Sequence, residues 1–251
     1  MINDLLLISG NDIPFFQAQL IIHQPNLKEI AYVGEETFYQ GCELLNFSKD
    51  LLEEEVKSNL VDKTNFDVLM SIIGDKTNQS RVSRRSLLDL LSLLFPDYQI
   101  NFGDEGIILA YQRDEFDEPI LHYINNRNFE EFKKIVKAMF CLDNKKDDTS
   151  AYNPGNSRAA EIARKLRKGR ERAAKAKNEG GKVAILSRYA SILAVGECKS
   201  LNSLMEYTVY QLYDEFQRFE LKQNFDIYMQ AKMAGAKDME DVDNWMKDIH
   251  P

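Results

Sequence analysis

The sequence has no paired cysteines and no cluster of metal-binding residues. Its three cysteines, Cys42, Cys141 and Cys198, are odd in number and widely spaced. This pattern is typical of free thiols in a reducing compartment rather than of a disulfide framework. The three histidines are equally scattered, and no Cys or His pair has the spacing of zinc ligands. We therefore expect no metal site and no cofactor.

Long apolar runs are also missing. No stretch approaches the roughly 18 to 20 apolar residues that a membrane-spanning helix needs. The first residues, MINDLLLISGNDIP, have neither the basic region nor the long apolar core of a signal peptide. The sequence therefore predicts a protein that works in the cytoplasm and has no membrane partner.

Catalytic motifs are a third absence. Carboxylates are plentiful at 53–55, 114–118, 147–148 and 238–243, but they lie in polar runs with no adjacent histidine. Such runs are typical of solvated faces and turns rather than of acid–base or two-metal sites. The Gly103–Gly106 turn lacks the GxxxxGK[ST] pattern of a phosphate-binding loop, and no nucleophile elbow is present. We expect a protein that is not an enzyme.

The sequence does contain the material of a folded core, with 44% apolar and 10% aromatic residues. In residues 1–142 short β-type runs alternate with helical patterns. A hairpin is predicted from Asp4–Ser9 and Gln19–Gln24. Further strands are predicted on either side of the Gly103–Gly106 turn and after it, at 98–102, 106–111 and 119–124. Helices are predicted at 27–45, 48–58, 65–73, 81–95 and 128–141.

Residues 143–157 (DNKKDDTSAYNPGNS) form the clearest boundary, because they are polar, contain Pro-Gly and have no hydrophobic period. Residues 158–251 have helical patterns throughout. The sequence thus predicts an α+β protein that is predominantly helical. Its N-terminal region, 1–142, is mixed and contains small β-hairpins. A linker or loop at 143–157 leads to an all-helical C-terminal region.

The apolar pattern between Leu201 and Ile249 is the strongest candidate for a binding surface. Its apolar residues recur at steps of three and four, as on one face of a helix, but the stripe shifts between Phe219 and Phe225. That shift indicates either a helix break or a helix that contacts two neighbours. Core packing is the simpler interpretation for much of this face, and a groove or ridge for a partner helix is the functional one. The residues that we predict to contact a partner are Tyr207, Tyr210, Tyr213, Phe225, Tyr228 and Trp245.

A basic segment is the second candidate. Residues 158–182 hold ten Lys or Arg and three Glu, a net charge of +7, while the rest of the chain carries −15. A solvated helix is the leading interpretation. An acidic protein partner and sequence-nonspecific binding of nucleic-acid phosphates are the alternatives. This basic patch consists of Arg158, Arg164, Lys165, Arg167, Lys168, Arg170, Arg172 and Lys175.

Several short motifs in the second half of the sequence resemble those of one phage protein type. A weaker resemblance lies at Gln24-Pro25. The motifs are Tyr152–Pro154, Ala159–Lys168, Ser187–Leu193, Leu204, Tyr210–Asp214, Ala234–Lys237 and Trp245–His250. Together they resemble a protein found in the tail gene modules of phages and prophages of Gram-positive bacteria, of the tail assembly chaperone type.

The resemblance implies a non-catalytic protein that binds the long helical tape-measure protein, or another tail protein, in the bacterial cytoplasm. A protein of this type is expected to keep its partner soluble while the tail tube assembles. Self-association is left open. The alternatives are a structural component of the virion and a nucleic-acid-binding phage protein that uses the basic helix.

Overall fold

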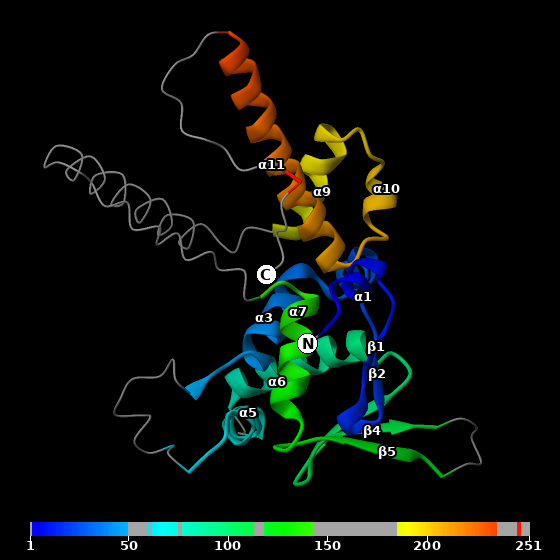
Figure 1. The fold of residues 1–251 in the computed structure, drawn as a ribbon. Coiled ribbons are helices and arrows are strands. Elements are labelled where there is room, and N and C mark those ends of the chain that lie inside the picture. The colour runs from blue at the N-terminus through cyan, green and yellow to red at the C-terminus, as the bar shows by residue number, and fades with distance from the viewer. Residues whose placement is uncertain are drawn as a thin grey trace, which may run out of the picture.

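The computed structural model describes residues 2–49, 60, 62–74, 77–112, 118–142, 185–234 and 245–246. Helices dominate these residues, and the strands form two small antiparallel sheets (Figure 1). The predicted class, α+β and predominantly helical, is confirmed.

The first predicted strand is wrong, because Asp4–Ser9 is helix α1. The Asn3 side chain accepts a hydrogen bond from the Leu5 amide, and Gly10 ends the helix in the left-handed conformation at φ 70°. These two caps stabilise a short helix where the apolar run alone suggested a strand. The hairpin lies further along the chain, where β1 (Ile13–Phe15) pairs with β2 (Leu20–Ile22) around the short helix η1 (Phe16–Ala18).

The predicted helix at 27–45 is two helices, α2 (Leu27–Val33) and α3 (Glu35–Leu45). The break falls at Gly34, whose φ of 95° belongs to the region that side chains disfavour. Two further helices, α5 (Asn65–Gly74) and α6 (Asn78–Leu94), are close to their predicted positions. The start of α6 is three residues earlier than predicted, because the Thr77 side chain caps it.

The three-stranded sheet matches the prediction closely. Its strands β3 (Gln99–Gly103), β4 (Gly106–Tyr111) and β5 (Ile120–Ile124) are antiparallel, in the order β3-β4-β5. A two-residue turn between Gly103 and Gly106 joins β3 to β4. Helix α7 (Phe129–Met139) follows.

The N-cap residue of α7, Asn128, makes no capping hydrogen bond to this helix. The Asn128 side chain instead accepts a hydrogen bond from the Asn125 amide at 2.8 Å and donates one to the Tyr123 carbonyl at 2.8 Å. It therefore holds the turn that leaves β5 rather than the first turn of the helix.

The C-terminal part contains α9 (Ile185–Gly196), the single-turn α10 (Leu201–Leu204) and the 25-residue α11 (Val209–Met233). Helix α11 is continuous from Phe219 to Phe225, where the apolar stripe shifts. Of the two interpretations of that shift, the helix break is therefore wrong. The main contacts of α11 are with α9, α1 and α7. In Figure 1 its far end projects beyond the rest of the described helices.

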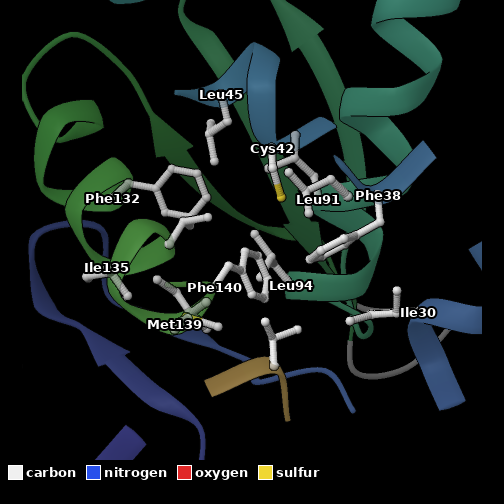
Figure 2. Close-up of a cluster of buried hydrophobic side chains, with 14 of the residues drawn as sticks. Ile30, Phe38, Cys42, Leu45, Leu91, Leu94, Phe132, Ile135, Met139 and Phe140 are labelled. Carbon is white, nitrogen blue, oxygen red and sulfur yellow. The ribbon is translucent and has the colours of Figure 1, made fainter. Parts of the chain in front are cut away.

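One hydrophobic cluster runs through the described residues from Leu7 in α1 to Phe216 in α11. Its centre is formed where side chains of α2, α3, α6 and α7 point toward one another (Figure 2). The α3–α6 contact is especially close, because a methyl group on Gly41 would lie 2.7 Å from the Ser86 carbonyl oxygen. The three cysteines are free thiols, and Cys42 is buried within this centre.

Three predicted segments lie wholly or largely outside the described residues. They are the helix at 48–58, the linker at 143–157 and the basic helix at 158–178.

Candidate functional site

Helix α11 begins at a junction with the N-terminal half, built from two capping boxes. In the first, Asn26 and Glu29 exchange hydrogen bonds at the start of α2; in the second, Thr208 and Gln211 do so at the start of α11. The two cap residues, Asn26 and Thr208, also pair with each other as an isolated antiparallel bridge. The Leu27 amide donates to the Tyr207 carbonyl oxygen at 2.9 Å. The starts of the two helices are therefore fixed to each other.

Helix α1 joins the same junction. The Gln211 side chain, besides capping α11, donates from Nε2 to the Ile8 carbonyl oxygen at 2.7 Å. Gln24, which belongs to the weaker part of the resemblance, is 4% exposed and donates to the Leu6 carbonyl oxygen at 3.1 Å. This junction was not predicted from the sequence, although the spacings Asn-x-x-Glu and Thr-x-x-Gln are capping-box signals.

His23 adds a titratable group to the junction. Its Nδ1 lies 2.8 Å from Asp12 Oδ1, and its Nε2 lies 3.2 Å from the Glu29 carboxylate that caps α2. Burial of the ring acts to lower its pKa, but the hydrogen bonds and charges of Asp12 and Glu29 outweigh burial, so that the pKa is raised above its usual value. When it is protonated, the ring can donate one hydrogen bond to each of the two carboxylates.

The three predicted tyrosines lie on the proximal half of α11 or just before it, and they make contacts within the protein. Tyr210 is 3% exposed and belongs to the hydrophobic cluster. The Tyr213 hydroxyl lies 3.5 Å from that of Tyr39, and burial raises the Tyr213 pKa. Tyr207 accepts a hydrogen bond from Lys199 Nζ at 3.1 Å. Their role toward a partner stays a prediction.

Helix α9 covers the proximal half of α11 with aromatic contacts. The Tyr189 ring stacks on Phe216 with 3.8 Å between centroids and meets Tyr213 edge-on at 5.2 Å. Leu212, on the same stretch of α11, is fully buried. The proximal half of α11 is therefore part of the hydrophobic core.

The distal half of α11, from Leu221 to Met233, is different. Phe225 is half-buried, while Met229 is 39% and Met233 is 84% exposed. Tyr228 is buried at 8%, and Lys232 Nζ approaches its hydroxyl at 3.4 Å and its ring centroid at 5.4 Å. Phe225, Met229 and Met233 are four residues apart, so they form one stripe along the helix. We call these three residues the distal face.

Trp245 lies over the proximal half of α11. It is half-buried and lines a groove of about 550 Å³ together with Ile8 and Phe219. Charged and polar side chains form the remaining wall, among them Glu215, Lys222 and Gln211. Trp245 is thus placed against the helix, and its role toward a partner stays a prediction.

The eight residues of the basic patch lie outside the described residues, and its nucleic-acid interpretation stays a prediction. Within the described part of the chain, no group of three or more His, Cys, Asp or Glu side chains could hold a metal ion. No helix of that part is long and apolar enough to cross a membrane.

Comparison with known families gives a match to the C-terminal part of the chain. A family model described as the second domain of YomV matches residues 175–250, the region that contains α9, α10 and α11. YomV is a Bacillus prophage-type protein, so the match points to a phage-related protein. No curated protein and no solved structure matches the chain.

Proposed function

We propose that the chain is a non-enzymatic phage tail assembly chaperone, which uses the distal face of α11 to bind a helical partner. The tape-measure protein is the partner that the sequence resemblance implies. The proposal places this binding in the cytoplasm of an infected or lysogenic bacterium.

The exposed distal face is the observation that carries the proposal. Met229 and Met233 are exposed apolar side chains, and Phe225, one turn before Met229 on the same face, is only half-buried. Burying a side chain of this size stabilises a complex by roughly 1.5–3 kcal/mol before the costs of association. Because methionine is unbranched and flexible, it fits irregular apolar surfaces. An amphipathic helix read at steps of four residues is a partner of matching form.

The position of the distal face supports the same proposal. The junction of capping boxes and the contact with α9 hold the proximal half, and the distal half extends from this support (Figure 1). A partner that lies along the distal face can therefore be bound without opening the core. The matched prophage domain includes this whole helix.

Co-expression with the tape-measure protein of the same genome tests the proposal. Size-exclusion chromatography at two salt concentrations would then show whether the two proteins co-elute. We expect the tape-measure protein to stay in solution and co-elute with the wild-type chain at both salt concentrations, because apolar contacts carry the binding. The variant Met229→Glu/Met233→Glu should lose co-elution.

A matched control adds the same charge to a neighbouring face of α11. Gln223 and Gln230 are both exposed and lie about 100° or more around the helix from the centre of the distal face. The variant Gln223→Glu/Gln230→Glu should bind as the wild type does. Equal binding by both double variants would contradict the role of the distal face, and a tape-measure protein that precipitates with every variant and the wild type would contradict the chaperone.

A further inference from the structure

Strand β5 has one unpaired edge. The sheet order is β3-β4-β5, so β5 has β4 on one side and no strand of the described residues on the other. Gly103 pairs with Gly106 across the two-residue turn. In an antiparallel pair this places the backbone amides of every second β4 residue, beginning with Gly106, toward β3. The intervening residues, such as Leu109, bond to β5 at Ile120, His122 and Ile124. The backbone groups of Leu121 and Tyr123 therefore point away from β4. The Tyr123 carbonyl oxygen among them already accepts a hydrogen bond from Asn128 Nδ2 at 2.8 Å.

This edge has no charged side chain that would protect it against pairing, although η1 packs against part of the strand, where His122 Nδ1 lies 3.0 Å from the Ala18 carbonyl oxygen. Exposed edge strands are commonly blunted by lysine or other charged residues, and the run from Pro119 to Ile124 (PILHYI) contains none. Ile120 is 58% and Leu121 is 46% exposed. A groove of about 560 Å³ runs beside the strand, and Phe16, 83% exposed at the hairpin tip, lines it with Leu121.

The charges at the two ends of β5 are self-complementary. Glu118 lies just before the strand and Arg127 just after it, both exposed. Neither forms an ion pair within the described residues. When two copies of such a strand pair in antiparallel fashion, the acidic end of each lies beside the basic end of the other. A different partner strand would need these charges in reverse order, whereas a second copy supplies them automatically.

We propose that the chain forms a two-fold symmetric dimer by antiparallel pairing of β5 with β5 of a second copy. The two-fold axis passes at His122, which places Leu121 opposite Tyr123 of the other copy as a hydrogen-bonded pair. The outward amides and the Leu121 carbonyl then gain partners, and the Tyr123 carbonyl oxygen accepts a second hydrogen bond beside that from Asn128. The side chains of the two residues form an apolar cross-strand pair on the outer face of the sheet. The three-stranded sheets of the two copies then join into one sheet of six strands.

This dimer is weak and concentration-dependent. Stable interfaces bury about 800 Å² on each partner, and one short strand with a few neighbouring side chains provides less. The dimer does not depend on the distal face of α11, and binding of a helical partner and dimer formation can be separated by variants.

Sedimentation equilibrium of the full chain over a range of concentrations tests the proposal. We expect a reversible monomer–dimer equilibrium. Leu121→Lys should weaken it by about tenfold or more in Kd, because the substitution places a charge at the free edge beside the second strand. The control Val82→Lys changes a side chain that is 57% exposed on α6 and should leave the equilibrium unchanged.

Charge reversal tests the antiparallel register. Glu118→Arg alone and Arg127→Glu alone should each weaken the dimer, because each brings like charges together at both ends. The double variant Glu118→Arg/Arg127→Glu restores opposite charges and should restore the dimer. A chain that is monomeric at every concentration would overturn the proposal. A dimer that Leu121→Lys leaves intact would also overturn it, since another surface would then form the contact.

Discussion

The two halves of α11 have similar apolar content but different surroundings. In the proximal half, Leu212 is fully buried and Phe216 is 8% exposed, and both belong to the core cluster. In the distal half, Met229 is 39% and Met233 is 84% exposed. Helical spacing alone does not distinguish them. The difference comes from what lies against each half, since α1, α7 and α9 are the main contacts of the helix.

This contrast separates residues that stabilise the fold from residues that are available to a partner. Helices in proteins take most of their stability from the packing of one face. The proximal half has that packing together with a capping box at Thr208. The distal half continues the same helix, and its distal face is not covered by a comparable set of packing contacts from the described residues. Substitutions along one helix should therefore have opposite consequences for stability and for binding.

The largest effect is expected in the proximal half. Leu212→Ala should lower the free energy of unfolding by about 2–5 kcal/mol, because it removes a fully buried side chain and leaves a cavity. Ile227→Ala is the control on the distal half, where the side chain is 62% exposed, and should change it by about 0.5 kcal/mol or less. Urea unfolding followed by circular dichroism measures both. Similar losses for the two variants would remove the contrast.

The next effect concerns the junction at the start of α11. Thr208→Ala removes the side-chain oxygen that accepts from the Gln211 amide, and should cost about 0.5–2 kcal/mol. Ser200→Ala is a matched control, because Ser200 stands at the N-cap of α10 but makes no capping hydrogen bond. Its cost in the same urea experiment should be clearly smaller. An equal cost would mean that the hydrogen bond at Thr208 contributes little.

The sequence predicted those parts of the fold whose signals are local. Strands β3 to β5 were found because the Gly103–Gly106 turn and the alternating runs agree. The run Asp4–Ser9 was misassigned, since six residues are too few to separate a strand from a helix by periodicity, and the caps Asn3 and Gly10 decide the outcome. The break at Gly34 was missed because the apolar spacing continues across it.

The candidate site was less accessible from the sequence. The burial of Tyr210 depends on elements that are distant in sequence, and the same pattern would fit an open face. The split of α11 into a packed and an exposed half arises in the same way, because the contacts of α9 and α1 with it are tertiary. The bridge between Asn26 and Thr208 joins residues that are 182 positions apart in the sequence. Only its two capping boxes could have been recognised in advance.

A smaller effect is expected from the pH dependence of the junction. The pKa of His23 is raised in the folded protein, so the protonated ring stabilises the fold. This contribution is fully present below the unfolded-state pKa of about 6.5, and it is lost as the pH rises through the higher folded-state pKa. The test compares wild type with His23→Gln, by urea midpoints from about pH 5.5 to about pH 8.5. The wild-type advantage should shrink with rising pH; an advantage that grows with pH would contradict the assignment.

The smallest effect on stability is expected where the largest effect on binding is proposed. Met229→Glu/Met233→Glu should change the free energy of unfolding by about 0.5 kcal/mol or less per site, because both side chains are already exposed. Urea unfolding beside Gln223→Glu/Gln230→Glu measures this, since the control carries the same added charge. The result decides how a loss of partner binding is interpreted. If the methionine variant unfolds as the control does, lost co-elution reports on the distal face itself. If it is much less stable, these methionines contribute to the fold, and the distinction between the two halves of α11 fails.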